Sequence, residues 1–202
     1  MGEALEHLRF AQASDAVQLE ELKRIIRASP VLMETLETAK TMGLPDWWVV
    51  SGAIYNQVWN DLTGRPEMYG VKDIDLFYFD PDTSWEAEDA VIQRGASLFR
   101  DTPPVEIRNQ ARVHIWYKDH FGEDYPALGS SAQGIDHFAC KTHCIGVRLT
   151  DDLDIYAPFG LRDVFSFRIT PNPVLNNRET HERKAVRQSR LWPELEVIAW
   201  PG

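Results

Sequence analysis

Two aspartates, Asp73 and Asp75, have the spacing with the clearest chemical meaning in the sequence. They open an apolar and aromatic run at residues 73–79 that is typical of a β-strand. Residues two apart in a strand project from the same face, so we expect both carboxylates to point one way, with Cβ atoms roughly 6 to 7 Å apart. One divalent ion can bridge two such groups, and Mg²⁺ is usually bound by one or two carboxylates together with substrate phosphates. The ordinary alternative is an acidic pair exposed beside a turn.

A phosphate could be held just upstream of this pair. An apolar strand is predicted at residues 47–50, and Ser51 and Gly52 follow it where a helix over residues 53–62 is expected to begin. Backbone N–H groups at a helix N-terminus bind anions, and the Ser51 hydroxyl could add a further donor. Lys72 directly precedes the acidic pair, where it could offset the negative charge or contact a phosphate.

A third carboxylate is expected from a later strand. Glu106 stands between two β-branched residues in a strand predicted over residues 105–108. Asp154 has the same apolar-acid-apolar setting in the second strand of a hairpin predicted over residues 144–156. We favour Glu106 because its strand immediately follows the aspartate pair along the chain. If the two strands are neighbours in the sheet, three carboxylates converge beside the expected phosphate position.

The order of these motifs resembles that of the polymerase-β-like nucleotidyltransferase superfamily: apolar-Ser-Gly, then Asp-apolar-Asp-apolar, then apolar-Glu-apolar. More closely, the chain is similar to a bacterial family of uncharacterised nucleotidyltransferase-like proteins, from residue 45 to residue 200. The stretches that carry this similarity are residues 46–48, 52–59, 72–75, 79–80, 84–88, 105–116 and 156–161.

The resemblance implies an α/β (α+β) fold with a mixed sheet, and transfer of a nucleoside monophosphate from an NTP to an unidentified small-molecule or protein acceptor. Two Mg²⁺ ions are implied, both bound by Asp73 and Asp75, with Glu106 ligating the ion that activates the acceptor hydroxyl. Ser51 and Gly52 would hold the triphosphate. The chain departs from the superfamily pattern in the longer spacing from Gly52 to Asp73 and in a hydroxyl that precedes the glycine. A catalytically degenerate binding module and a metal-dependent phosphohydrolase are the alternatives.

Further polar residues follow the third carboxylate. Arg108, Arg112 and His114 could share its side of the sheet edge, because residues 112–117 alternate as a strand does. They would then neutralise phosphate oxygens or position an acceptor, and Trp116 would offer a stacking face for a base. The alternative is a salt-bridged strand with a buried indole.

Basic residues near the C-terminus form a stripe. Arg183, Arg187 and Arg190 share one face of a helix expected over Arg178–Leu191, and the default interpretation is a solvated face, with contact to a triphosphate or another polyanion as the alternative. Asn56 lies one helical turn past Gly52, where it could bond the nucleotide or cap its own helix.

Four potential zinc ligands, His137, Cys140, His143 and Cys144, fall within eight consecutive positions. They lack the separated pairs with which a chain wraps a tetrahedral ion, so we interpret the cysteines as small core residues.

Strands and helices alternate along the chain, so we expect one mixed α/β domain over residues 1–202 with its sheet flanked by helices. It would comprise a helical N-terminal segment at residues 1–43, a catalytic core at residues 45–170 and the C-terminal helix at residues 178–192. Two further helices are expected over residues 85–100 and 131–141.

Composition limits the function classes further. The chain has 202 residues, with 21 Lys and Arg against 31 Asp and Glu, for a net charge of −10. This acidic balance argues against a long nucleic-acid acceptor and favours a small-molecule or protein acceptor. Two cysteines are too few for a disulfide scaffold and the N-terminus lacks a signal-peptide pattern, so a cytoplasmic location is expected. No run of 18 apolar residues predicts a membrane span.

Overall fold

A mixed sheet in the strand order β3-β2-β1-β4-β5 forms the centre of the protein in a computed structural model, which describes residues 3–99 and 103–202. Strands β2 and β3 are parallel, and the other neighbouring pairs are antiparallel. The five strands are β1 (Trp48–Val50), β2 (Ile74–Tyr78), β3 (Val105–Asn109), β4 (Gly146–Leu149) and β5 (Leu153–Tyr156). The mixed sheet with flanking helices confirms the fold class expected from the sequence.

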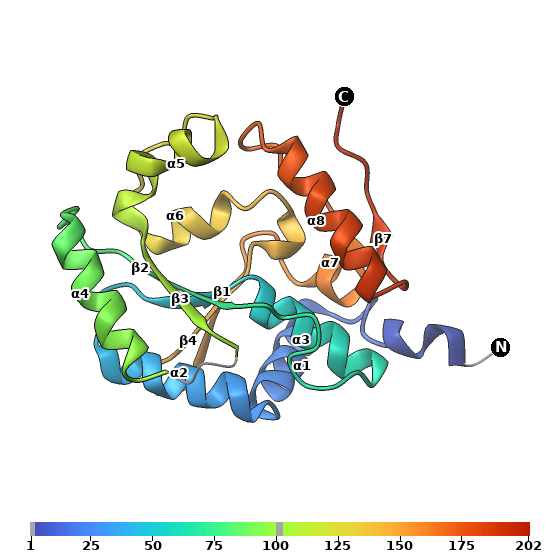
Figure 1. The fold of residues 1–202 in the computed structure, drawn as a ribbon. Helices are drawn as coiled ribbons and strands as arrows, with labels where there is room; N and C mark the ends of the chain where they lie inside the picture. Colours follow the sequence, from blue (N-terminus) through green and yellow to red (C-terminus); the bar gives the residue numbers. More distant parts are fainter. Residues whose placement is uncertain (1–2, 100–102) are drawn as a thin grey trace.

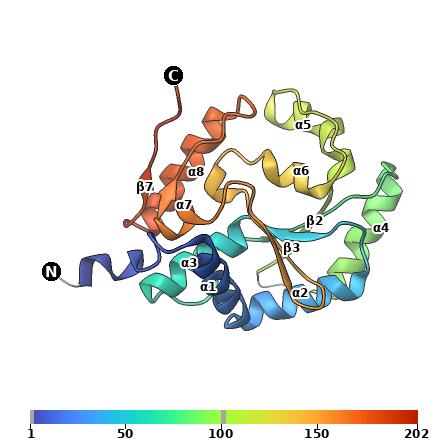
Figure 2. The same cartoon turned by 180° about the vertical axis from the view of Figure 1, so that it is seen from behind.

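The main hydrophobic core lies on one face of the sheet. Helices α1 (Asp15–Arg27) and α2 (Pro30–Met42) cover this face, and α3 (Gly52–Thr63) packs beside them (Figures 1 and 2). Ser14 and Ser29 cap the first two helices with their side chains, and Gly43 ends α2 in the left-handed conformation, with φ at 60°. These caps set where the two helices begin and where α2 ends.

Alternation along β2 assigns its side chains to the two faces. Ile74, Leu76 and Tyr78 are buried in the main core, whereas Asp75 and Phe77 are only partly buried and belong to the opposite face. That opposite face is covered by α5 (Val113–Phe121), α6 (Ser131–Asp136) and α8 (Arg178–Leu191), as both views show. Its hydrophobic cluster is small, so part of this face is left for polar side chains and cavities.

The remaining elements connect these layers. Helix α4 (Trp85–Ala96) is the crossover between the parallel strands β2 and β3. The others are the short helices η1 (Glu3–Leu8), η2 (Gln110–Arg112), η3 (Lys141–His143) and α7 (Arg162–Phe165), and a separate parallel pair of short strands, β6 (Arg168–Ile169) and β7 (Glu196–Val197). Within the described ranges, no helix is long and apolar enough to cross a membrane.

The strand predicted over residues 112–117 was wrong, because this segment begins helix α5. Asn109, the last residue of β3, accepts a hydrogen bond from the Ala111 amide with its side chain and so starts a turn that leaves the sheet. Three alternating pairs are too few to distinguish a strand from an amphipathic helix, and the capping asparagine decides the outcome.

Two helix boundaries also differ from expectation. Helix α6 ends at Asp136 instead of continuing to residue 141, and Cys140 instead forms an isolated antiparallel bridge with Pro171. Helix α4 ends at Ala96, and Arg100, where it was expected to end, lies outside the described residues.

Candidate functional site

The sheet register places the acidic side chains together. Asp75 is the Cα partner of Glu106 in the parallel ladder and of Val50 in the antiparallel ladder with β1. Asp73 lies just before the first residue of β2. Ser51, which follows Val50, is therefore close to the acidic end of β2. The three motifs are separate in the sequence but lie together in the structure, because β1, β2 and β3 are neighbours in the sheet.

A small cavity of about 60 Å³, here called the inner cavity, lies at this point. Carboxylates, basic groups and the turn between β1 and α3 contribute to its walls. It is lined by Ser51, Gly52, Tyr55, Asn56, Val71, Lys72, Asp73, Asp75, Lys184, Arg187 and Gln188.

The turn from β1 into α3 leaves backbone N–H donors available. Ser51 has φ at 58° and ψ at −113°, an unfavourable conformation for a residue with a side chain, of the kind that concentrates at functional sites. Its amide donates to the Ile145 carbonyl at 2.8 Å, which holds the turn against the segment before β4. Its side chain makes no capping bond to α3. The first amides of α3 thus lack the side-chain acceptor that usually satisfies them.

Gly52 is not required by packing. A Cβ atom at this position would meet its nearest neighbour, the Tyr55 hydroxyl, at 3.8 Å, which is an ordinary contact. The absence of a side chain therefore leaves room for a ligand beside the helix N-terminus.

Asn56 supplies an unsatisfied polar atom at the same place. The residue is only 2% exposed, and its Oδ1 has no hydrogen-bond partner. A buried acceptor without a partner costs free energy unless a ligand supplies a donor. Since Asn56 lines the inner cavity, its amide is available to a bound molecule.

Three cations surround the inner cavity: Lys72 from the loop before β2, and Lys184 and Arg187 from α8. Arg187 donates to the Gly70 carbonyl at 3.0 Å and thereby fixes α8 to that loop. Lys184 was missing from the candidates predicted from sequence, and Arg187 had been considered only as part of a basic stripe, with contact to a triphosphate as the alternative to a solvated face. The signal available was the i, i+3, i+4 spacing of Lys184, Arg187 and Gln188, which places all three on one helix face.

The charges around Asp75 act on its ionisation. Burial, together with the neighbouring Asp73 and Glu106 carboxylates, raises the pKa of this carboxyl to about 6, against the opposing charges of Lys184 and Arg108. An acid with a pKa raised in this way is stabilised by any cation that binds beside it.

The carboxylates are not gathered as a complete metal cage. Within residues 3–99 and 103–202, no group of three or more His, Cys, Asp and Glu side chains is close enough to hold a metal ion. Glu106 is instead directed to Arg108, at 3.3 Å, with both side chains nearly half exposed. Asp73 and Asp75 nonetheless fit an ion that takes its remaining ligands from phosphates and water, which is how proteins usually bind Mg²⁺.

A second cavity of about 310 Å³, here called the aromatic cavity, adjoins the first, and Asp75 and Lys184 line both. Phe77 and Phe138 stack in its wall at 5.6 Å between ring centroids. Its lining includes Glu106, Arg108, Trp116, Tyr117, Tyr125 and His137. Two of the candidates predicted from sequence, Glu106 and Arg108, thus face this cavity, as does Trp116.

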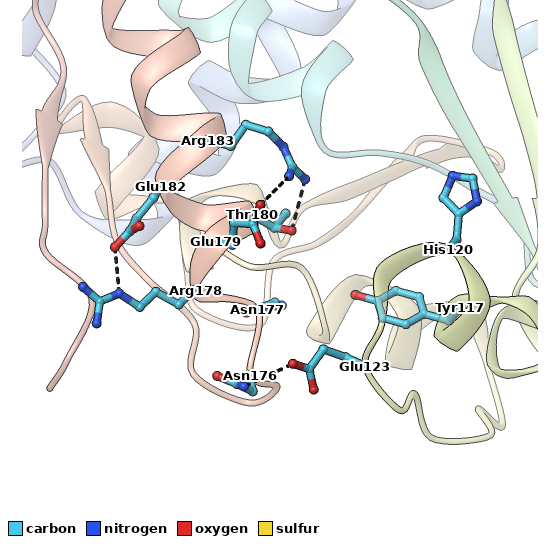
Figure 3. A pocket seen from close by; sticks show the side chains of 10 residues that line it. All are labelled: Tyr117, His120, Glu123, Asn176, Asn177, Arg178, Glu179, Thr180, Glu182 and Arg183. Carbon is cyan, nitrogen blue, oxygen red and sulfur yellow. Dashed lines mark hydrogen bonds and ion pairs between the residues drawn. The ribbon is translucent and has the colours of Figure 1, made fainter.

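A wider groove continues outward between α5 and α8 (Figure 3). It shares Tyr117, Asn177, Thr180 and Arg183 with the aromatic cavity. Asn176 and Glu123 bridge its two sides at 3.3 Å. The three spaces are therefore adjacent, since each shares lining residues with the next.

The structure places Arg112 and His114 away from these cavities. Arg112 is buried, donates to the Ser84 carbonyl at 2.7 Å and pairs with Glu88 at 3.4 Å. His114 is exposed on α5 and lines neither the inner nor the aromatic cavity. Both had been expected beside Glu106 on the assumption that residues 112–117 continue as a strand.

Asp154 lies on β5, separated from β2 by β1 and β4, and pairs with Arg148 at 3.0 Å. Of the two candidates for a third carboxylate, only Glu106 is next to Asp75.

The four possible zinc ligands do not converge either. Cys140 and Cys144 are free and buried, and burial raises the pKa of each thiol to about 12. Both cysteines belong to the hydrophobic clusters of the two faces.

Comparisons with known proteins agree with this arrangement. A family model described as Nucleotidyltransferase matches residues 37–197. A solved NMR structure described as revealing a CCA-adding enzyme head domain is similar, with 27% sequence identity and a TM-score of 0.68. That similarity covers 90% of this chain and 96% of the other. No curated protein matches the sequence.

Proposed function

The chain belongs to the nucleotidyltransferase family, and from this premise we propose that it transfers a nucleoside monophosphate from an NTP to a small-molecule or protein acceptor with the help of Mg²⁺. One observation carries the proposal. The inner cavity brings together an uncapped helix N-terminus, two aspartates and three basic side chains, which are the groups that binding of a metal-chelated triphosphate requires.

The size of the inner cavity supports phosphate binding there. At about 60 Å³ it suits phosphate groups but is too small for a nucleoside. The amides at the start of α3 and the Ser51 hydroxyl would donate to phosphate oxygens, and Lys72, Lys184 and Arg187 would neutralise their charge. The Oδ1 atom of Asn56 would accept a hydrogen bond from a ligand hydroxyl or from a water that the ligand orders.

Asp73 and Asp75 would hold Mg²⁺. The bound metal would supply charge stabilisation for the reacting phosphate and orient the acceptor oxygen. The protein's own contribution would be positioning, since no covalent protein intermediate is needed. The charges around Asp75 support this role, because a cation there relieves the repulsion between three neighbouring carboxylates.

The acceptor would bind in the aromatic cavity. Glu106 faces that cavity beside Asp75, so an acceptor hydroxyl there would be close to the metal-binding carboxylates. A cavity of about 310 Å³ that opens into a groove admits a small molecule or the side chain of a protein.

A non-catalytic binding module has one observation in its favour, the pairing of Glu106 with Arg108 at 3.3 Å, which leaves the third acid occupied. A metal-dependent phosphohydrolase would use the same carboxylates, but it would release inorganic phosphate instead of pyrophosphate.

Parallel incubations with α-labelled and γ-labelled NTPs test the proposal. The protein, Mg²⁺ and each of the four NTPs are incubated with a fractionated cell extract as the acceptor source. A nucleotidyltransferase places the α-label on an acceptor and releases the γ-label as pyrophosphate. Release of the γ-label as inorganic phosphate indicates the hydrolase, and no Mg²⁺-dependent change in either label contradicts both enzymatic functions.

A further inference from the structure

Lys184 of α8 lies at the junction of two cavities. The inner cavity and the aromatic cavity adjoin each other, and among the residues that the structure describes only Asp75 and Lys184 line both. Asp75 belongs to β2 in the sheet, whereas Lys184 belongs to a helix that covers this face of the sheet (Figures 1 and 2). A carboxylate from the sheet and an ammonium group from the helix therefore both border the place where the two cavities meet.

The Lys184 ammonium group has no anionic partner across the part of the chain that the structure describes. Two neighbours on the same helix are paired: Arg178 lies 2.7 Å from Glu182, and Arg183 lies 3.8 Å from Glu179. Lys184 is only partly exposed, so its charge is removed from part of its hydration without an ion pair to compensate. An anion bound at the junction would supply the missing partner.

An aromatic contact restrains the Lys184 side chain. Its Nζ atom lies over the ring of Phe138, 5.6 Å from the centroid, where the face of the ring attracts a cation. Phe138 in turn stacks on Phe77, with ring centroids 5.6 Å apart. Phe77 is two residues after Asp75 and projects from the same face of β2. Two rings thus connect the ammonium group to the strand position next to Asp75.

The helix that carries Lys184 is itself fixed one turn further on. Arg187 donates to the Gly70 carbonyl at 3.0 Å, which ties α8 to the loop before β2. Gln188 Nε2 donates to the Tyr55 hydroxyl at 2.6 Å, which ties α8 to α3. A side chain on a helix held in this way is pre-organised to act on a bound molecule.

The proposed function puts the reacting phosphorus at the same junction, because the phosphates would lie in the inner cavity and the acceptor in the aromatic cavity. During transfer the acceptor oxygen forms a bond to the α-phosphorus, and the bond from this phosphorus to the oxygen of the β-phosphate breaks. The electron pair of the broken bond leaves with pyrophosphate, and the proton of the acceptor hydroxyl leaves to solvent. The α-phosphorus must therefore lie between the two cavities, since it is bonded to a group in each during the reaction.

We propose that Lys184 is a catalytic residue, whose ammonium group binds a non-bridging oxygen of the α-phosphate and stabilises the negative charge on it in the transition state. This inference rests on the proposed function. Enzymes that transfer phosphoryl groups depend largely on positioning and on cations that neutralise the charge of the reacting phosphate. Lys72 and Arg187 differ from Lys184 because they line the inner cavity but not the aromatic cavity, so they would contact phosphates away from the reacting atom.

Separate measurements of binding and of transfer test the proposal. Calorimetry measures the binding of a nonhydrolysable NTP with Mg²⁺, and the rate of α-label transfer is measured at saturating NTP with the extract fraction that takes up the label. Lys184→Gln should weaken binding by about tenfold but slow the saturated rate by roughly 100-fold, because the contact strengthens in the transition state. Lys184→Arg keeps the charge and should recover part of the lost rate. Arg190→Gln is the matched control: it removes a charge from the same helix, lines neither cavity and should change neither quantity.

Sulfur substitution at the α-phosphate identifies the atom that Lys184 contacts. The two diastereomers of an α-thio NTP each carry sulfur in place of one non-bridging α-oxygen. In the wild type we expect the diastereomer whose sulfur faces Lys184 to react roughly tenfold more slowly than the ordinary NTP, because sulfur is the poorer hydrogen-bond acceptor. Replacing Mg²⁺ by Mn²⁺ should not restore this rate. In Lys184→Gln the same substitution should cost less than about twofold, because the group that distinguishes oxygen from sulfur is gone.

The outcomes separate the inference from the proposed function. If the wild type transfers no α-label, the proposed function fails and the inference falls with it. If the wild type transfers the label, two results overturn only the inference: Lys184→Gln slows saturated transfer no more than Arg190→Gln does, or the α-thio loss is the same in Lys184→Gln as in the wild type. Should Lys184→Gln prove unfolded by circular dichroism, the α-thio loss in Lys184→Arg gives the decision, since an unchanged loss would contradict contact at this atom.

Discussion

Asp75 and Glu106 are directly paired residues of the parallel β2–β3 ladder, so two carboxylates lie side by side on the face of the sheet that carries the cavities. A third, Asp73, lies two residues before Asp75. Stability alone would not favour such an arrangement, because like charges at this distance repel one another. A cation bound between the carboxylates would offset this repulsion.

The first prediction concerns the pH dependence of stability. The pKa of Asp75 is about 6 in the folded protein and has an ordinary value of 3.8. The contribution of the protonated Asp75 carboxyl to the free energy of unfolding is therefore fully present below about pH 3.8. It is lost as the pH rises through about 6. In metal-free buffer at pH 8, Asp75→Asn should be more stable than the wild type, by about 1 to 3 kcal/mol. Urea unfolding measures this difference, which should shrink towards pH 4. A variant less stable than the wild type at pH 8 contradicts this account.

The second prediction separates the two candidates for the third carboxylate. Glu106→Gln should lower Mg²⁺-dependent transfer by roughly 100-fold, since it removes a charge beside the reacting groups. Asp154→Asn is the matched control, because Asp154 lies on β5, at the opposite edge of the sheet from β3, and pairs with the partly exposed Arg148. Initial rates of α-label transfer to the acceptor found in the labelling experiment decide between them. Equal losses of activity in the two variants would contradict the assignment of Glu106 as the third carboxylate from its pairing with Asp75.

A third prediction uses Gly52. Gly52→Ala should fold at least as stably as the wild type, because the new Cβ meets nothing closer than 3.8 Å and alanine is the better helix former. We expect nucleotide affinity to fall nonetheless, since the methyl group occupies space at the helix N-terminus where a phosphate would approach. Thermal unfolding and NTP titration of the same preparation test both parts. Unchanged affinity would place the phosphates elsewhere.

The basic face of α8 provides a fourth prediction. Lys184→Gln should weaken NTP binding by about tenfold, and the loss should be smaller at high salt, where the charge of the wild-type lysine is screened. Arg178→Gln serves as the control on the same helix, because Arg178 pairs with Glu182 at 2.7 Å and does not line the inner cavity. Titrations at two ionic strengths provide the comparison. If both variants bind NTP as the wild type does, α8 has no part in nucleotide binding.

We expect Arg112 to contribute to the stability of the fold and not to substrate binding. Arg112→Met leaves the carboxylate of Glu88, which is only 5% exposed, without its cationic partner, and breaking such a buried pair typically costs about 3 to 5 kcal/mol. The melting temperature should fall clearly, while the activity per folded molecule stays near the wild-type value. If the variant is as stable as the wild type but binds NTP more weakly, Arg112 belongs to the nucleotide site and this prediction is wrong.

Local patterns were sufficient to predict the backbone setting of the residues at the centre of the candidate site. Three features each reflect backbone geometry that acts over a few residues: the alternation around Asp75, the Ser-Gly turn after β1 and the apolar-acid-apolar setting of Glu106. The bounds of Arg178–Leu191 were also predicted correctly, because its polar sequence has few competing structures.

Other features depend on contacts between distant parts of the chain. The sequence pattern could not show that Lys184 and Arg187 face the acidic residues, because α8 meets β2 only through the tertiary fold. The same holds for Arg112, whose partners Ser84 and Glu88 belong to another helix. The strand predicted over residues 112–117 failed because one asparagine cap at the end of β3 outweighed a short alternation.

The most direct test of the central claim is a calorimetric titration with Mg²⁺ and a nonhydrolysable NTP. We expect the wild-type protein to bind one nucleotide per chain only when Mg²⁺ is present, and Asp73→Ala and Asp75→Ala to remain folded but to lose this Mg²⁺-dependent binding. If both variants bind the nucleotide with wild-type affinity and the same dependence on Mg²⁺, the two aspartates do not form the metal and nucleotide site.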